Sequence, residues 1–135
     1  MWVGIGGRTN ADGIEQLRAH LESFGADIVP VSLTKALHLK STVTALPDGT
    51  IVGWQPVVDH PGVWGERFLA VPEEPGAHVV LLDNDALLMS SAAPQTADLF
   101  GRRGYRVVGV DISEFEKLEG CVTCLSVRLR GRPGF

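Results

Sequence analysis

Apolar residues recur along this chain in two rhythms, one typical of amphipathic helices and the other of short strands. Apolar positions three or four residues apart, followed by Gly25, predict one helix, and a proline near the first turn together with Gly104 predicts a second. A Ser-x-x-Glu capping box predicts a third, and a further short helix is expected over 60–67. Short runs rich in Val, Ile and Leu, bounded by Gly, Pro, Asn and Asp, predict strands. The predicted helices are 14–24, 60–67, 94–103 and 113–118, and the predicted strands are 2–5, 26–33, 37–46, 51–54, 68–71, 78–82, 86–89, 105–110 and 123–129.

The order of these elements predicts an α/β protein with an internal repeat. A strand–helix–strand unit is followed twice by strand–strand–helix–strand, with a turn at 47–50, and a short helix and strand come last. A repeat unit cannot bury its apolar faces alone, so neighbouring units must cover it. We therefore expect one domain over 1–135, with repeats at about 1–33, 36–71 and 77–111 and a closing helix and strand at 113–130.

Composition and charge narrow the class of protein. The chain has 135 residues, 44% of them apolar, which suits one compact domain with a core. Its net charge of -4 argues against nucleic acid as a partner. No apolar run approaches the roughly 20 residues that span a bilayer, and the first residues do not resemble a signal peptide. We expect a cytoplasmic protein that binds neither nucleic acid nor a membrane.

The two cysteines, Cys121 and Cys124, have the C-x-x-C spacing of redox and zinc sites. On a strand over 123–129, however, residues three apart point to opposite faces and lie roughly 10 Å apart, whereas a disulfide needs Cα atoms within about 7 Å. We therefore expect no redox pair, and no zinc site, since a second close pair of ligands is missing. Cys124 falls on the polar face with Ser126 and Arg128, which makes it a candidate nucleophile; a small buried thiol is the alternative.

His38 and Arg8 are the other candidates for chemistry. His38 alternates with Leu37 and Leu39 and so leaves the apolar face of its predicted strand, although an ordinary structural histidine is the alternative. A cysteine and a distant histidine are the minimal set for thiol catalysis. Arg8 lies in a glycine-rich turn before a helix, where it either binds a carboxylate or is a surface arginine. The segment 4–9 has the strand, the G-x-G and the following helix of a dinucleotide-binding motif, which makes nucleotide binding a further alternative, but the missing third glycine argues against it.

Three segments, taken together and in this order, resemble the dimethylarginine dimethylaminohydrolases of the guanidino-group-modifying (pentein) superfamily. The likeness covers nearly the whole chain, but it reaches only the carboxy-terminal half of a typical family member. It implies a partial α/β-propeller of ββαβ repeats, roughly half of a five-bladed ring. The segments are Gly7-Arg8-Thr9-Asn10, Leu37-His38-Leu39-Lys40-Ser41, and Ser113 to Gly120 followed by Thr123-Cys124-Leu125-Ser126-Val127.

The resemblance implies a role for each matched residue. Cys124 would attack the guanidinium carbon of an Nω-methylated arginine. His38 would protonate the leaving methylamine and then activate the water that releases citrulline from a covalent thiouronium. Arg8 would hold the substrate α-carboxylate, and the Leu118 carbonyl would accept from the α-ammonium; no metal or other cofactor is implied. Lys40 stands where arginine deiminases and amidinotransferases of this superfamily carry aspartate, which favours the dimethylargininases over these related enzymes.

Half a ring is expected to be incomplete as an enzyme. The family's guanidinium-binding carboxylates come from the other half, and no acidic residue of this chain is assigned to that role. Open sheet edges and uncovered apolar faces favour association, so we expect self-association or pairing with an N-terminal half chain. Two functions stay open: hydrolysis of methylated arginine by a completed enzyme, and a non-catalytic module that binds a guanidino or amino-acid ligand.

Overall fold

The computed structural model describes residues 1–82 and 85–127 of the chain. None of the helices in these two ranges is long and apolar enough to cross a membrane. The α-helices are α1 (Ala11–Leu21), α2 (Pro94–Arg102) and α3 (Ser113–Glu116). The strands are β1 (Trp2–Ile5), β2 (Val29–Ser32), β3 (Val43–Ala45), β4 (Ile51–Gly53), β5 (Phe68–Ala70), β6 (Val80–Leu81), β7 (Ala86–Ser90) and β8 (Arg106–Val110).

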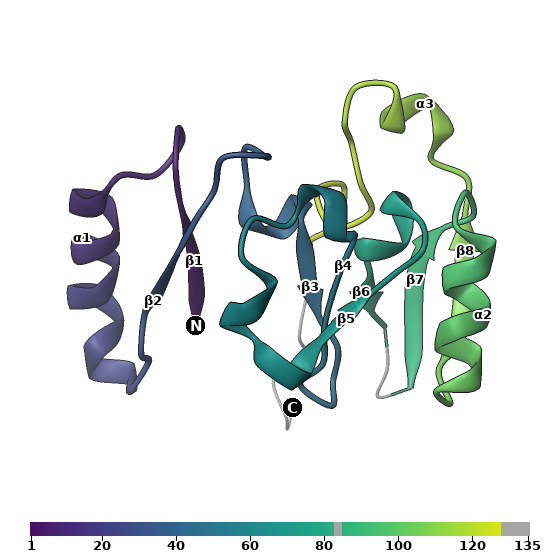
Figure 1. Ribbon diagram of the computed structural model, residues 1–135, viewed down its shortest axis with the longest axis horizontal. Coiled ribbons are helices and arrows are strands. Elements are labelled where there is room, and N and C mark those ends of the chain that lie inside the picture. Colours follow the sequence, from purple (N-terminus) through teal and green to yellow (C-terminus); the bar gives the residue numbers. More distant parts are fainter. Residues whose placement is uncertain (83–84, 128–135) are drawn as a thin grey trace, which may run out of the picture.

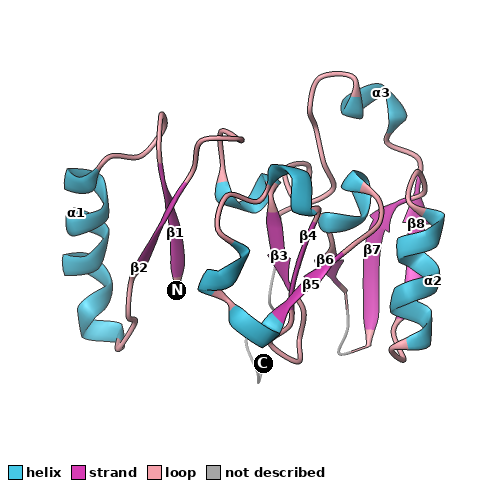
Figure 2. Ribbon diagram, in the orientation of Figure 1, coloured by secondary structure: helices cyan, strands magenta, loops and turns pink. Residues whose placement is uncertain are grey.

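The strands form small sheets from segments that are close in sequence. β1 and β2 pair in parallel. In the next sheet β3 is antiparallel to β4, and β4 is parallel to β5; β6, β7 and β8 repeat this arrangement. The sheets follow one another along the long axis of the molecule (Figure 1), and the two longer helices lie at its opposite ends (Figure 2). The predicted α/β class is confirmed.

A polar residue precedes helix α1, and a glycine ends the helical segment that continues from it. The Asn10 side chain accepts a hydrogen bond from the Gly13 amide at 2.9 Å, so Asn10 rather than Thr9 satisfies a free amide of the first turn. After a 3-10 turn over Glu22–Phe24, Gly25 ends the helical segment with φ 69°, a conformation that glycine adopts without strain.

The turn predicted at 47–50 is confirmed and joins β3 to β4. The Leu46 amide donates to the Thr50 carbonyl at 2.8 Å, and Gly49 has φ 84°. The Asp48 carboxylate accepts from the Thr50 amide at 2.9 Å, and this hydrogen bond lowers the pKa of Asp48.

The segment between β4 and β5 differs from the predicted helix over 60–67. Pro61 has no amide proton, Gly62 favours helix poorly, and Gly65 has φ 53°, so an α-helical hydrogen-bond ladder does not propagate. The middle unit therefore carries 3-10 turns where the third unit carries α2. These turns are Gln55–Val57, Pro61–Val63 and Gly65–Arg67.

Helix α2 is anchored by a carboxylate from a preceding loop. Ala93, at its N-cap position, has no side-chain acceptor, and Glu73 Oε2 instead accepts from the Thr96 amide at 2.8 Å and from the Thr96 hydroxyl at 3.0 Å. Thr96 is fully buried against Gly76, where an added Cβ would lie 2.5 Å from the Thr96 Cβ. This close approach requires glycine at position 76.

Two apolar clusters join the three sheets. The larger joins the second sheet to the third and to α2, and Phe100 and Leu87 are fully buried in it. The smaller joins β2 to the second sheet and includes Trp64. The larger cluster consists of Leu46, Val52, Val71, Ala77, Val79, Leu87, Met89, Ala93 and Phe100; the smaller consists of Val31, Val43, Ile51, Val58 and Trp64.

Two predicted strands are wrong where they carry candidate residues. Within 37–46 only Val43–Ala45 forms a strand, and a 3-10 turn over Leu39–Ser41 precedes it. Within 123–129 the described residues, up to 127, form turns and irregular chain rather than a strand, and the rest lie outside the described residues. Short apolar alternation does not by itself distinguish strand from turn.

The predicted capping box at the start of α3 is also wrong. Ile112, not Ser113, occupies the N-cap position, and it makes no side-chain capping bond. Ser113 instead donates its amide to Asp111 Oδ1 at 2.9 Å. The Asp111 carboxylate thus accepts from an amide at the start of the helix, whereas Ser113 was expected to cap it.

Candidate functional site

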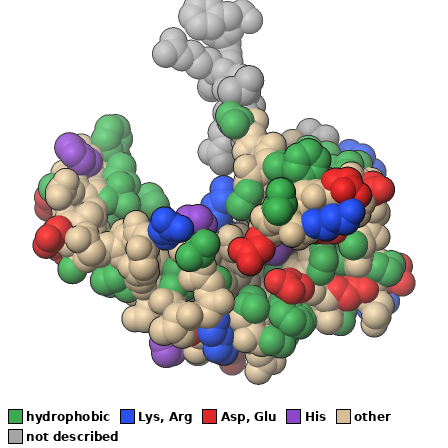
Figure 3. Space-filling model, turned by 90° about the horizontal axis from the view of Figure 1, so that it is seen from above, with side chains coloured by type: hydrophobic (Ala, Val, Ile, Leu, Met, Phe, Trp, Pro, Cys, Tyr) green, Lys and Arg blue, Asp and Glu red, His purple; other side chains and the backbone are tan. Residues whose placement is uncertain are grey.

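A cavity of about 730 Å³ lies where the segments around residues 35–41, 74–78 and 112–124 meet. Basic, histidine and acidic side chains lie close together near the middle of the face shown in Figure 3. The titratable or nucleophilic groups that line the cavity are Lys35, His38, Glu74, His78, Glu116, Glu119, Cys121 and Cys124.

His38 enters the cavity from an anchored loop after β2. Its backbone is extended, with φ -135° and ψ 141°, and its carbonyl accepts from the Ser41 amide at 3.0 Å. Asp59 anchors the loop by accepting hydrogen bonds from the Thr34 hydroxyl, from the Thr34 amide at 2.9 Å and from the Lys35 amide at 3.3 Å. The bonds from Thr34 hold the pKa of Asp59 below its ordinary value.

Both cysteines lie in one tight turn. The Cys124 and Leu125 amides each donate to the Cys121 carbonyl at 3.0 Å. Cys121 is buried, Cys124 is exposed, and their sulfur atoms lie 3.2 Å apart. The expected separation of roughly 10 Å was wrong because it assumed an extended strand, whereas the turn places residues three apart on the same side.

The two thiols influence each other's ionisation. Burial raises the pKa of Cys121, but hydrogen bonds with the Thr123 hydroxyl, at 3.1 Å, and with Cys124 outweigh burial and lower it. The pKa of Cys124 is raised, first by burial and then by the hydrogen bond to Cys121 and the charge of the Cys121 thiolate. The positive charge of Lys40 opposes this rise. The pair therefore gives up its first proton more readily than its second.

Lys40 connects the histidine segment to the cysteine turn. Its Nζ donates to the Thr123 carbonyl at 3.2 Å, across 83 positions of sequence. The Leu-His-Leu-Lys-Ser pattern singled out Lys40 only as a family marker. The tertiary structure adds that Lys40 holds the turns of His38 and Cys124 together.

Leu118 and its neighbours also line the cavity. The Leu118 and Gly120 amides both donate to the Phe115 carbonyl, at 3.0 and 2.9 Å. Between them Glu119 has φ 60°, which is in the left-handed region. This conformation is energetically unfavourable for any residue other than glycine. Leu118 is 86% exposed. Leu118, Glu119 and Gly120, which form this bend, all line the cavity.

Sequence analysis missed the acidic lining of the cavity. Glu74, Glu116 and Glu119 all line it, together with His78, whose Nε2 lies 3.1 Å from the Ser41 carbonyl. The glutamates come from two separate segments, so no local pattern marks them. Within residues 1–82 and 85–127, no group of three or more His, Cys, Asp or Glu is placed to hold a metal ion.

Arg8 is the predicted site residue that lies apart. It is exposed in the turn after β1, which the Gly6 amide closes by donating to the Thr9 carbonyl at 3.0 Å, and it does not line the cavity. The structure thus brings His38, Leu118 and Cys124 to one cavity, but not Arg8.

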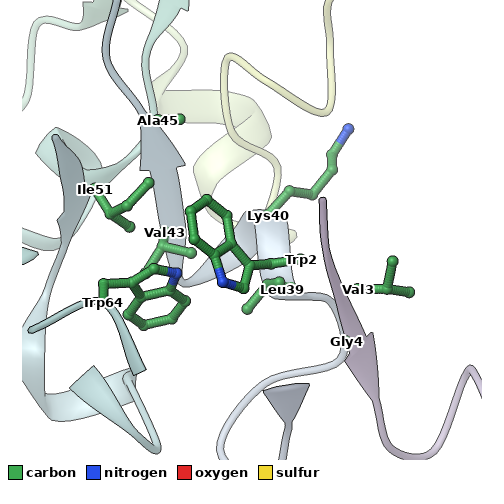
Figure 4. Close-up of a pocket in the computed structure, with 9 residues that line it drawn as sticks. All are labelled: Trp2, Val3, Gly4, Leu39, Lys40, Val43, Ala45, Ile51 and Trp64. Atoms are coloured by element: carbon green, nitrogen blue, oxygen red, sulfur yellow. The ribbon is translucent and has the colours of Figure 1, made fainter. Parts of the chain in front are cut away.

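A second cavity, of about 370 Å³, lies between the first and second sheets and is mainly apolar. The Trp2 and Trp64 rings meet edge to face there, with centroids 6.3 Å apart. Figure 4 shows the Lys40 amino group pointing away from both indoles. Among the described residues, those that line this cavity include no cysteine, histidine, aspartate or glutamate, in contrast to the larger cavity.

No protein-family model matches the sequence. The chain is 62% identical, over 130 residues, to a dimethylarginine dimethylaminohydrolase from Streptomyces coelicolor, a match that covers 96% of this chain and 50% of that protein. Over nearly its whole length the chain is thus similar to half of a dimethylarginine dimethylaminohydrolase. The resemblance found in three short segments is thereby confirmed, and the chain spans about half the length of the curated relatives it matches.

Solved dimethylarginine dimethylaminohydrolases share the fold. One, from Pseudomonas aeruginosa, is a cysteine-to-serine mutant complexed with citrulline; it is 33% identical, with a TM-score of 0.83, over 95% of this chain and 51% of that one. Another is a histidine-to-glycine adduct with S-methyl-L-thiocitrulline, 32% identical with a TM-score of 0.83, covering the same shares of the two chains.

Proposed function

We propose that this chain supplies the nucleophile and the acid/base of a cytoplasmic dimethylarginine dimethylaminohydrolase, which converts Nω-methylated arginine to citrulline and an alkylamine. The observation that carries the proposal is that His38 and Cys124, far apart in sequence, line the same cavity. The relatives point to the same chemistry, since the solved enzymes described above bind citrulline and S-methyl-L-thiocitrulline.

The proposed reaction has two halves. The Cys124 thiolate attacks the guanidinium carbon, and the C–N bond to the methylated nitrogen breaks as His38 donates a proton to the leaving amine. For asymmetric dimethylarginine that amine is dimethylamine. The resulting thiouronium is then attacked by water, from which His38 takes a proton, and the C–S bond breaks to release citrulline and the thiol.

The cavity lining suits a cationic amino acid. Glu74, Glu116 and Glu119 give it negative charge, which favours a guanidinium and an α-ammonium group. We assign the Leu118 carbonyl to the α-ammonium. We assign Arg8 to the α-carboxylate, which requires the bound substrate to extend from the cavity toward the turn after β1.

The raised pKa of Cys124 bears on the choice between an enzyme and a non-catalytic module. A protonated thiol is a weaker nucleophile than a thiolate, so the raised pKa lowers the reactivity of Cys124 while no ligand is bound. A guanidinium bound beside Cys124 adds a positive charge and lowers the thiol pKa. We therefore favour an enzyme whose nucleophile is activated when the substrate binds.

We propose that a second half completes the site. The third sheet with α2 forms a ββαβ unit, and the second sheet has 3-10 turns in place of the helix. Together with the β1–β2 unit beside them, they are read as part of a five-bladed propeller. Apolar side chains stay exposed, among them Phe24 at 81% and Val127 at 88%, which supports burial by another chain or another part of the protein. A second copy of this chain is the alternative partner.

The test is citrulline release from asymmetric dimethylarginine, measured with the chain alone and with the part of the Streptomyces coelicolor relative that the chain does not cover. Cys124→Ser is the blank. His38→Ala is expected to lose at least 100-fold in rate, by the usual contribution of a general acid/base, whereas His20→Ala, on α1, keeps the full rate. Turnover that survives Cys124→Ser would refute the assignment. Turnover by the chain alone would refute the need for a second half.

A further inference from the structure

The Cys121–Cys124 turn contains a second thiol that the proposed hydrolysis does not use. Hydrolysis needs one thiol, yet a second lies 3.2 Å from it in a turn closed by two backbone hydrogen bonds to the Cys121 carbonyl. Neither cysteine is in a disulfide. Cys121 is only 5% exposed, whereas Cys124 is exposed and lines the larger cavity.

The geometry of the turn is suited to closing a disulfide. A disulfide has its sulfurs about 2.05 Å apart, so these two must approach by only about 1.2 Å. The turn already holds the two residues together, because the Cys124 amide bonds to the Cys121 carbonyl at 3.0 Å. Closure therefore needs side-chain rotation and little movement of the backbone.

We propose that Cys121 and Cys124 form a reversible oxidative modification site, at which a hydroperoxide converts the two thiols to an intramolecular disulfide. Cys124 is the attacking thiol because it is the one that solvent reaches. Cys121 is the resolving thiol because it is buried directly behind it. The Thr123 hydroxyl, 3.1 Å from Cys121 Sγ, is placed to stabilise the resolving thiolate by donating a hydrogen bond.

The chemistry balances with one hydrogen peroxide. Cys124 sulfur attacks one peroxide oxygen, the O–O bond breaks, and a sulfenic acid forms as water leaves. Cys121 sulfur then attacks the sulfenic sulfur, the S–O bond breaks, and the departing hydroxide takes the Cys121 proton to form a second water. Two thiols lose two electrons in total, and the peroxide gains them.

This site has a consequence that rests on the proposed function. A disulfide removes the Cys124 thiolate from the cavity, so oxidation stops hydrolysis until a thiol reductant restores the pair. It also protects Cys124, because a sulfenic acid that is captured by a neighbouring thiol does not proceed to the irreversible sulfinic and sulfonic acids. The disulfide itself forms whether or not the chain hydrolyses anything.

The test measures mass and thiol content rather than activity, so its outcome is independent of the proposed function. The reduced chain is treated with a small molar excess of hydrogen peroxide, and its intact mass and reactive thiols are measured before and after dithiothreitol. We expect the chain to lose the mass of two hydrogen atoms and both reactive thiols, and to regain both on reduction. Cys121→Ser, the matched control, is expected to gain oxygen atoms instead and to lose its thiol irreversibly.

Three results would overturn the proposal: gain of oxygen by the unmodified chain, a disulfide between two chains, or retention of both thiols. Circular dichroism of Cys121→Ser checks that the control is folded. If it is not, the unmodified chain decides by itself, because loss of two hydrogens and of both reactive thiols without a change in chain number requires the internal disulfide.

Discussion

Replacing Lys40 with methionine removes the bond that joins the turn after His38 to the turn of Cys124. Lys40 Nζ donates to the Thr123 carbonyl at 3.2 Å, and its charge opposes the other influences that raise the pKa of Cys124. Methionine keeps most of the side-chain length but carries neither donor nor charge. The substitution should therefore loosen the cysteine turn and raise the pKa of Cys124 further.

The size of the effect on stability follows from the exposure of this bond. An exposed hydrogen bond with a charged donor contributes about 1 kcal/mol to the free energy of unfolding, less than a buried one would. For a chain of this length that corresponds to a fall of about 3–5 °C in Tm. Lys117→Met is the matched control, since Lys117 is also exposed and bonds one nearby partner, Glu114, at 2.7 Å.

The assay is the rate of Cys124 alkylation by iodoacetamide as a function of pH, with Cys121→Ser as the background so that one thiol is followed. Lys40→Met should move the reactivity curve to higher pH than the background alone, whereas Lys117→Met should leave it in place. If both lysine variants give the same curve as the background, Lys40 does not influence the thiol. An unchanged Tm for Lys40→Met would show that the bond contributes nothing to the fold.

Three further predictions concern stability. Glu119→Gly relieves a φ of 60° and should stabilise the chain by about 0.5–1 kcal/mol in urea unfolding, while Glu119→Ala, which keeps a Cβ at this conformation, should gain nothing. Gly76→Ala forces a Cβ to 2.5 Å from the Thr96 Cβ and should lower the free energy of unfolding by about 1–3 kcal/mol. The control Gly101→Ala, in open space on α2, should raise it by up to about 1 kcal/mol. Equal effects of the two substitutions would refute the close approach at Gly76. Hydrogen bonds from the loop before His38 lower the pKa of Asp59 in the folded chain. The contribution of Asp59 to the free energy of unfolding is therefore complete above its pKa in the unfolded chain, near 3.9, and is lost as the pH falls through the lower pKa of the folded chain. The difference in Tm between the unmodified chain and Asp59→Asn should therefore shrink as the pH falls below about 4, and a difference that persists or grows there would contradict this linkage.

The regular elements of the fold were predictable because local sequence determines them. Asn10, Gly25 and Pro94 mark helix boundaries through their own backbone and side-chain preferences, and the Asp48-Gly49 pair determines its turn in the same way. The helix predicted over 60–67 failed although its pattern was similar, because proline and glycine within it interrupt the hydrogen-bond ladder.

The sequence named candidate residues for the site but did not predict their geometry. Alternation of polar and apolar residues suggested strands at both His38 and Cys124, and both lie in or beside turns instead. For Cys124 this error reversed a conclusion, because an extended chain separates the two thiols and the actual turn brings them to 3.2 Å. A short apolar pattern fits both conformations, and the contact from Lys40 that links the two turns is invisible in the local sequence.

The sequence by itself determined where most helices and strands form and which residues are candidates for the chemistry, since each of these depends on neighbours within a few positions. The tertiary structure decided which of those residues meet. It brought His38 and Cys124 to one cavity, added three glutamates to its wall and left Arg8 outside. The physical reason is that packing between units joins segments up to 83 positions apart, and no periodic pattern within a segment records which partner will cover it.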